Sequence, residues 1–200
     1  MANKKLKILA AGDLHGNAEI AKGLAEKARK NKVDLVVLLG DIHGIRESKG
    51  MIAPFKKNKQ KVVFVPGNWD TSFEAGMLED IYGIKNLDAH YVTYKDIGIF
   101  GVGNPDFRLS LDEEEVFQKL KKEFDRTKVR KRILVSHLHA AGTKAEFSGW
   151  KGSKGLRKAI DYFKRDFFIS AHIHEAEGIE EKIGKTKIIN VGRNGKIFEV

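Results

Sequence analysis

Five short polar clusters in this sequence contain the residue types that hold divalent metals. They combine Asp, Asn and His with glycine or another small residue, and six of the seven histidines fall within them. Taken singly, each is a common turn or strand end, but together they predict a metal site with oxygen and nitrogen ligands. The clusters are Gly12-Asp13-Leu14-His15-Gly16, Gly40-Asp41-Ile42-His43-Gly44, Gly67-Asn68-Trp69-Asp70, Ser136-His137-Leu138-His139 and Ala171-His172-Ile173-His174.

This set of side chains is large enough for two cations. Two divalent ions a few ångströms apart repel each other, so a bridging carboxylate and a bridging hydroxide must lie between them. Neutral imidazoles and a carbonyl oxygen would complete each shell. One Asp, one Asn and four His around a bridging Asp supply those groups, so the clusters predict a two-metal centre.

The segments before the first three clusters are predicted to be buried strands. Nearly continuous apolar runs at 5–11, 33–40 and 61–66 are separated by segments that can form helices, which is typical of parallel strands in βαβ units. A stripe with four-residue spacing from Ile20 to Ala28 predicts one such helix. Because the carboxyl ends of parallel strands share one edge of a sheet, the clusters can converge there.

The second half is predicted to be strand-rich as well. Further strands are expected at 90–103, 132–136 and 166–171, followed by a meander at 179–200. Within that meander we predict a hairpin of 186–191 and 196–200 around Asn194-Gly195. The Gly-rich stretch 142–155 is interpreted as a long ordered loop, with Phe147 and Trp150 either packing it down or offering stacking surfaces to a substrate.

Composition narrows the possible classes of protein. The absence of cysteine excludes disulfides, thiolate metal sites and a cysteine nucleophile. With 200 residues and no Pro/Ser-rich linker we expect one domain, residues 1–200. No apolar run is long enough for a signal peptide or membrane span, so we expect a cytoplasmic protein with no membrane partner. The formal charge of +10 suits phosphate-bearing partners, but it is interpreted as solvated helix faces rather than a nucleic-acid groove.

In order and content, the five clusters resemble the calcineurin-like metallophosphoesterases, through GDLHG, GDIHG, GNWD, SHLH and AHIH. The resemblance implies an α/β fold of the four-layer α+β type, a central two-sheet β-sandwich flanked by helices. It implies Asp41 as the bridging ligand of the two cations. It further implies Asp13, His15 and His174 as ligands of the first metal, and Asn68, His137 and His172 as ligands of the second.

The third cluster departs from the family pattern. Members usually have Gly-Asn-His there, and that His is thought to protonate the leaving group, whereas this chain has Trp69, whose indole cannot act as an acid. The departure is similar to a small bacterial and archaeal phosphodiesterase branch. His139 is then the candidate for touching the leaving oxygen, with His43 behind it, although either could instead contact the ligands or solvent.

Two further polar residues are expected to support the ligands rather than bind metal. Asn17 is predicted to tighten the first loop, and Asp70 to orient a ligand histidine through a hydrogen bond. The catalytic roles are predicted for Asp41, Asn68 and His139.

The predicted activity is hydrolysis of a small phosphate ester, preferably a diester, by a hydroxide that two divalent ions activate. Mn²⁺ is the expected metal, with Fe, Zn²⁺ or Ni²⁺ as alternatives, because all tolerate this ligand mixture. A phosphomonoesterase or protein phosphatase, a non-catalytic scaffold of the same fold and a nuclease remain alternatives. A homo-oligomer is compatible with the sequence.

Overall fold

The structure is a computed structural model that describes residues 5–44, 50–163 and 166–200. Its strands are β1 (Lys7–Ala11), β2 (Leu35–Leu39), β3 (Val62–Val65), β4 (Lys85–Asn86), β5 (Tyr91–Tyr94), β6 (Ile97–Val102), β7 (Lys131–Ser136), β8 (Phe167–Ser170), β9 (Glu180–Ile183), β10 (Thr186–Asn190) and β11 (Lys196–Glu199). Its helices are α1 (Ala18–Lys30), α2 (Ala53–Lys57), α3 (Ser72–Tyr82), α4 (Glu113–Asp125) and α5 (Lys154–Phe163), with 3₁₀ turns η1 (Lys144–Ser148) and η2 (His174–Ala176).

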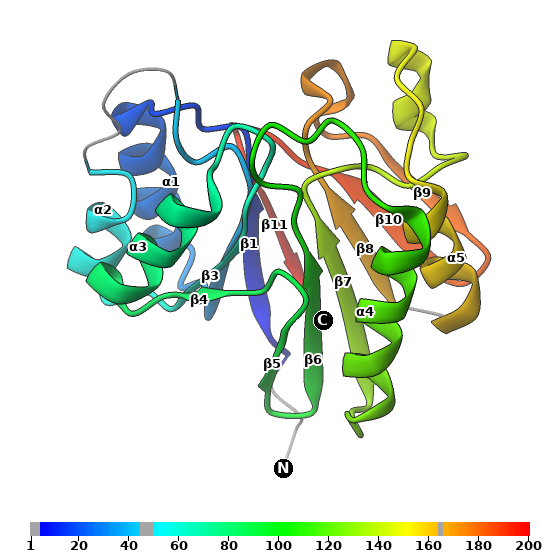
Figure 1. Ribbon diagram of the computed structural model, residues 1–200. Coiled ribbons are helices and arrows are strands. Elements are labelled where there is room, and N and C mark those ends of the chain that lie inside the picture. The colour runs from blue at the N-terminus through cyan, green and yellow to red at the C-terminus, as the bar shows by residue number, and fades with distance from the viewer. Residues whose placement is uncertain (1–4, 45–49, 164–165) are drawn as a thin grey trace.

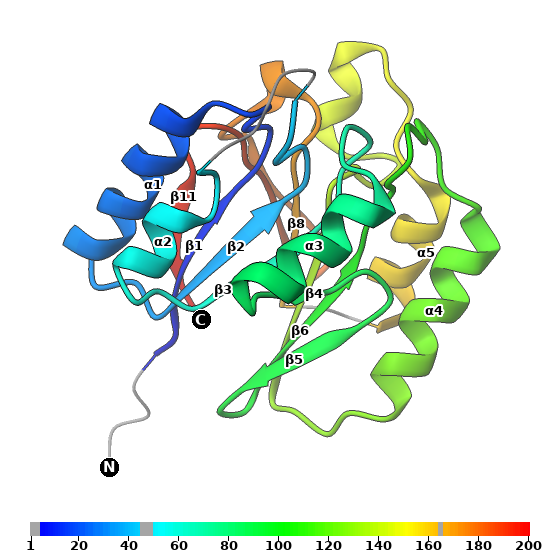
Figure 2. The same ribbon diagram turned by 60° about the vertical axis from the view of Figure 1, so that its left-hand side comes forward.

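Two mixed sheets form the centre of the molecule (Figure 1). The first has the strand order β11-β1-β2-β3-β4 and the second β5-β6-β7-β8-β10-β9. Figure 2 shows α1, α2 and α3 on the outer face of the first sheet and α4 and α5 on that of the second. The predicted two-sheet sandwich flanked by helices is therefore confirmed.

Alternating side chains of the strands divide into an inner and an outer core. Ile8 and Ala10 of β1 and Val37 of β2 face the inner core between the sheets, where they join residues of β6, β7, β8 and β10. Leu9 and Val36, one position along each strand, face the helices instead. Strands buried on both faces are apolar almost throughout, which is why the predicted runs are nearly continuous rather than alternating.

The parallel strands place their carboxyl ends at one edge of the sandwich. β1, β2 and β3 run parallel, as do β6, β7 and β8. The loops after them gather at the top of Figure 1, where η1 (yellow) and η2 (orange) rise above the sheets. All five polar clusters lie in those loops or at the strand ends beside them.

The predicted hairpin of 186–191 and 196–200 is wrong. β10 pairs with β8 and β9 in the second sheet, whereas β11 pairs antiparallel with β1 in the first. The turn at 193–195 therefore carries the chain from one sheet to the other. The hairpin of this region is β9–β10, which pair antiparallel. Gly184, between them, has the positive φ of 58° that a tight turn requires. An Asn-Gly pair is a turn signal, but strand pairing is decided by which sheet has a free edge.

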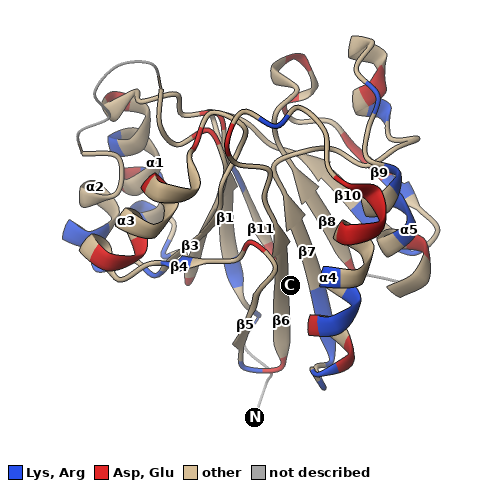
Figure 3. Cartoon of the chain, in the orientation of Figure 1, with Lys and Arg blue, Asp and Glu red and all other residues tan. Residues whose placement is uncertain are grey.

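Charged residues lie mainly on the helices and peripheral segments, as Figure 3 shows, while the facing sheets contain few of them. Within the described residues, no helix combines the length and apolar character that crossing a membrane requires.

Candidate metal centre

Asp41 lies between two groups of potential metal ligands. It follows β2 and is 2 % exposed. Its Oδ2 is 3.6 Å from Nε2 of His15, and its Oδ1 is 3.5 Å from Nε2 of His137. Each carboxylate oxygen thus faces a different group of ligands, which is the geometry that a bridging carboxylate requires.

The first group contains Asp13, His15 and His174, whose ligand atoms lie within 4.8 Å of one another. The Nε2 atoms of the two histidines are 3.3 Å apart, and Nε2 of His174 is 3.7 Å from Oδ1 of Asp13. Asp13 is buried after β1, whereas the side chain of His174 is half exposed. One face of this group is therefore open to a ligand from solvent.

The second group contains His137 and His172, whose ligand atoms lie within 4.8 Å of one another and of a carboxylate oxygen of the shared Asp41. Nε2 of His137 is 3.1 Å from Nδ1 of His172 and 3.1 Å from Oδ1 of Asn68. Asn68 therefore joins this group, and its carbonyl-type oxygen can serve as a neutral ligand.

The tautomer of His137 follows from its other ring nitrogen. Nδ1 lies 2.8 Å from the main-chain oxygen of Leu39 and must donate to it, because a carbonyl only accepts. Nε2 then holds a lone pair directed at Asn68 and Asp41. A carbonyl contact of this kind is the usual means of orienting a metal-binding histidine.

These groups fit divalent cations. Both carboxylate oxygens of Asp13 are buried without a hydrogen bond of normal geometry among the described residues, although the main-chain N–H of His172 lies close enough to stabilise its charge. Around Nε2 of His137, Oδ1 of Asn68 and Nδ1 of His172 lie at 3.1 Å and Oδ1 of Asp41 at 3.5 Å. Buried acceptors in such a cluster need a cation to offset their repulsion.

Burial keeps His137 and His172 neutral and makes the buried carboxyls hard to ionise without a cation. Burial lowers the pKa of His137 to about 4 and, with the neighbouring histidines, that of His172 to about 3. Burial also raises the pKa of Asp13 to about 8, and repulsion from Asp41 adds to this. Neutral imidazole is the form that binds a metal, whereas a bound metal would draw the proton from Asp13.

Four of these residues adopt a backbone conformation that L-residues rarely use. The φ angles are 57° for Asp13, 46° for His15, 50° for Asp41 and 69° for His172. Left-handed conformations are costly for residues other than glycine and concentrate at functional sites. A further constraint is that a Cβ on Gly67 would lie 2.2 Å from Oδ1 of Asp41. The tight packing at Gly67 holds the Asp41 carboxylate in place.

Asp70 holds two of these loops together instead of contacting a ligand histidine. It accepts hydrogen bonds from the main-chain N–H groups of Ile42, His43 and Gly67, and its Oδ1 is 3.1 Å from Nδ1 of His43. Burial alone would raise the pKa of Asp70, but the hydrogen bonds from His43 and Gly67 outweigh it and hold the pKa below its ordinary value. Asp70 therefore fastens the loop that carries Asp41.

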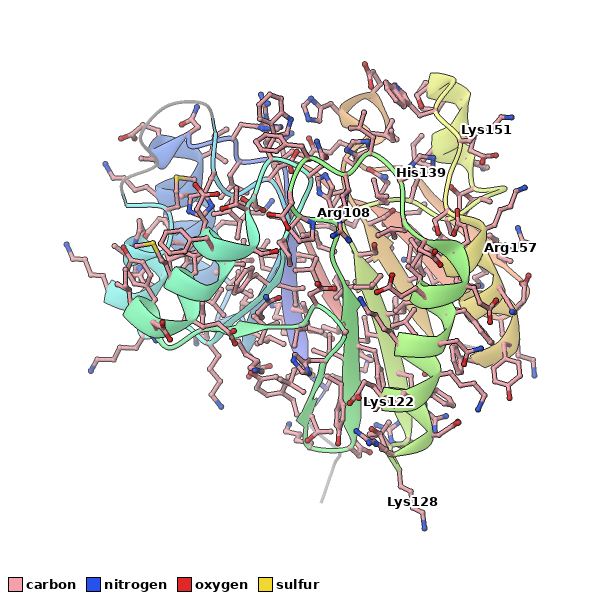
Figure 4. The ribbon with its side chains drawn as sticks, viewed as in Figure 1. Arg108, Lys122, Lys128, His139, Lys151 and Arg157 are labelled. Atoms are coloured by element: carbon pink, nitrogen blue, oxygen red, sulfur yellow. The ribbon has the colours of Figure 1, made fainter. Side chains whose placement is uncertain are left out.

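Asn17 and His139 also have structural partners. Asn17 caps α1 by accepting from the N–H groups of Glu19 and Ile20. His139 is 2 % exposed, and its Nε2 lies 3.2 Å from the main-chain oxygen of Trp150, to which it must donate. Figure 4 shows His139 beside the segment that carries Lys151. Because its one ring proton is donated to this carbonyl, His139 positions the segment around Trp150.

Two residues at the site were not among those predicted from the sequence. Arg193, in the turn between the sheets, donates from Nε to the main-chain oxygen of Asp13 at 2.8 Å and lines a pocket with Asp13 and His174. Leu109, in the segment after β6, lines a pocket of about 300 Å³ together with Trp69 and the candidate ligands His15 and Asp41. Neither belongs to a motif. From the sequence, Arg193 could reach this face but is interpreted as part of a plain hairpin turn, whereas Leu109 has no signal that singles it out.

The fold and the paired ligand groups define an α/β sandwich protein with a metal site at the carboxyl edge of its strands. The sequence matches the calcineurin-like phosphoesterase family over residues 6–176, which confirms the resemblance. The chain belongs to that family, whose members use divalent metals, and is a hydrolase acting on phosphoric esters.

Solved structures share the fold at low sequence identity. TT1561 of Thermus thermophilus has a TM-score of 0.76 at 16% identity, covering 98% of this chain and 99% of that one. A dimetal phosphatase from Danio rerio has a TM-score of 0.62 at 13% identity, covering 95% and 88%. An archaeal phosphodiesterase has a TM-score of 0.57 at 16% identity, covering 97% and 99%. No curated protein gave a match.

Proposed function

We propose that the protein is a phosphodiesterase that binds two divalent cations and that its native metal is Mn²⁺. The observation that carries the proposal is the position of Asp41, whose two oxygens face separate ligand groups. Asp13, His15 and His174 would hold one cation, and Asn68, His137 and His172 the other, with Asp41 shared. The mixture of carboxylate, amide and imidazole ligands is compatible with Mn²⁺, and Fe, Zn²⁺ and Ni²⁺ tolerate it as well.

Two such cations, when bound, supply a hydroxide near neutral pH and polarise the phosphoryl oxygens. The residues around them arrange the reaction. The main-chain oxygen of Leu39 accepts from Nδ1 of His137, which leaves Nε2 of that ring free to bind a metal. The Trp69 N–H donates to Oδ1 of Asp41 at 3.0 Å. The amide nitrogen of Asn68 is a donor that can stabilise charge on the phosphoryl group.

We propose a preference for diesters because of how the leaving group must depart from this site. Trp69 lines the pocket with the ligands and has no proton that can be transferred to an alkoxide. His139 does not line that pocket, and its ring N–H is held by the carbonyl of Trp150. The rate of hydrolysis falls least for esters with a good leaving group when no acid is present. Aryl diesters combine such a leaving group with a single negative charge.

The test compares wild type with Asp41→Asn. Metal content is measured together with hydrolysis of bis-p-nitrophenyl phosphate and p-nitrophenyl phosphate in Mn²⁺. We expect the wild type to bind two ions per chain and to prefer the diester. We expect the variant to lose at least one ion and about 100-fold or more in kcat/KM, since it lacks the shared charged ligand.

Asp161→Asn is the matched control, because Asp161 lies exposed on α5 and pairs only with Arg157 among the described partners. It should behave as wild type. A wild-type protein without bound metal, or an Asp41→Asn variant with full activity, would refute the proposal. A clear preference for the monoester would favour a phosphomonoesterase with the same site.

A further inference from the structure

Both tryptophans of the chain stand at the metal site. The sequence contains two, Trp69 and Trp150, from segments 81 positions apart. They line one pocket of about 300 Å³ together with the candidate ligands His15, Asp41, Asn68, His172 and His174. This volume is at the lower end of the range for small-molecule sites.

Each indole stands beside a different ligand group. The ring of Trp69 meets the ring of His15 edge-on at a centroid distance of 6.3 Å, and His15 belongs to the first group. The ring of Trp150 meets that of His172 edge-on at 6.4 Å, and His172 belongs to the second. The two rings therefore flank the pocket from opposite ends of the paired site.

The backbones of both tryptophans are anchored. The N–H of Trp69 donates to Asp41, and the main-chain oxygen of its neighbour Asn68 accepts from Phe107 at 2.9 Å. The main-chain oxygen of Trp150 accepts from the buried ring of His139. The segment is also held by the bond from Ser153 N to the main-chain oxygen of His139 at 2.9 Å.

The indoles nevertheless remain uncovered. Trp69 is 38% exposed and Trp150 is 56% exposed, and Leu109 between their segments is 60% exposed on the same pocket. Large apolar side chains grouped at the mouth of a polar site mark a surface that binds a ligand. Phe147 is 63% exposed in the same loop region but does not line this pocket, so exposure alone does not distinguish the tryptophans.

We infer that Trp69 and Trp150 determine specificity by stacking on a planar aromatic group attached to the phosphate ester. The inference rests on the proposed function and names its substrate class. The paired ligand groups would take the phosphoryl group, and the indoles would take the ring next to it. Indole faces stack on nucleobases and simple aryl rings alike, so the shared chemistry is a planar ring close to the phosphorus.

Binding to the metal-loaded protein tests the inference without relying on turnover. Calorimetric titration with adenosine 5′-monophosphate, phenyl phosphate and ribose 5-phosphate compares three phosphate monoesters, of which the third lacks a ring system. We expect adenosine 5′-monophosphate to bind about tenfold more tightly than ribose 5-phosphate, because stacking favours the base by that order of magnitude. If phenyl phosphate binds about as tightly as adenosine 5′-monophosphate, a simple aryl ring is sufficient for stacking. If phenyl phosphate binds weakly, the site requires a nucleobase.

Variants locate the interaction. Trp150→Ala should reduce the preference for adenosine 5′-monophosphate over ribose 5-phosphate to about twofold or less, whereas Phe147→Ala should retain it. Trp69→Phe and Trp150→Phe each leave one tryptophan in the chain, so quenching of the remaining fluorescence by adenosine 5′-monophosphate reports on that indole alone. Both single-tryptophan proteins should be quenched.

The inference is overturned if the wild type binds the three monoesters equally or binds none, or if Trp150→Ala keeps the full preference. None of these outcomes measures hydrolysis, so they leave the phosphodiesterase proposal intact. Conversely, loss of the proposed activity would show in the metal and turnover assays of Asp41→Asn and the wild type.

Discussion

At the scale of single residues, the site is an assembly of buried acceptors that a cation can satisfy. Asp13 and Asp41 are both nearly inaccessible to solvent, and burial raises the pKa of each. His137 is held by Leu39 in the form that offers Nε2 as a ligand. Without a cation, the protein relieves the repulsion by protonating a carboxyl group.

This predicts how the stability of the metal-free protein depends on pH. The pKa of Asp13 is about 8 in the folded protein and 3.8 in the reference state, so the folded state binds the extra proton between those values. The stabilisation is complete below about pH 4 and is lost as the pH rises through 8. In chelator, the free energy of unfolding should fall from pH 5 to pH 8 by about 1 kcal/mol or more beyond the change in Asp13→Asn.

The Asn side chain cannot ionise, so the difference between wild type and Asp13→Asn removes the contribution of all other titrating groups. Denaturant unfolding at both pH values provides the measurement. An identical pH dependence in wild type and Asp13→Asn would show that Asp13 is ionised in the metal-free protein.

At the scale of elements, loops after parallel strands are fastened by local hydrogen bonds. α3 begins directly after Asp70 with a capping box in which Thr71 and Glu74 exchange hydrogen bonds. Asp70 ties this helix start to the loop after β2. The capping signals are local in sequence, whereas the contact between the loops joins segments about 28 residues apart.

The capping box predicts the effect of Thr71→Ala. Loss of the hydroxyl leaves the N–H of Glu74 without its acceptor, which should lower the free energy of unfolding by about 1 kcal/mol. Thr71→Ser keeps the oxygen and should stay close to wild type. Chemical denaturation of the three proteins is the measurement. Equal stability of Thr71→Ala and wild type would mean that solvent replaces the cap without cost.

At the scale of the whole molecule, the ligands come from both sheets. Asp13, Asp41 and Asn68 follow β1, β2 and β3 of the first sheet, whereas His137, His172 and His174 follow β7 and β8 of the second. The inner core already joins the sheets through apolar contacts. Bound cations would add a second connection, placed at the edge where the loops meet.

Metal should therefore stabilise the entire fold. With free Mn²⁺ at about 100 times its dissociation constant, the free energy of unfolding should rise by about 2.7 kcal/mol for each site that binds only the folded state. Asp41→Asn should lose most of this gain, whereas Asp161→Asn should keep it. Denaturant unfolding with Mn²⁺ or with chelator measures the difference. A gain of equal size in Asp41→Asn would place the bound ion elsewhere.

The elements and the ligand-bearing clusters could be predicted from the sequence because their signals are local. Buried strands are apolar almost throughout, α1 has a stripe of buried side chains, and each cluster lies within a few residues of a strand end. The resemblance of the five clusters to a family then indicated the sandwich and the ligand set. The placement of the residues in two groups around Asp41 agrees with that assignment, which stays a proposal until metal is measured.

Only the tertiary structure decided the contacts that depend on distant segments. β11 joins β1 across almost the whole chain instead of pairing with β10, because the first sheet offers an edge there. Asp70 contacts His43 rather than a ligand histidine, and His139 meets the carbonyl of Trp150. Trp69 and Trp150 come to one pocket from separate loops. Residue types determine which side chains can bind metal, but the packing of two sheets determines what each of them faces.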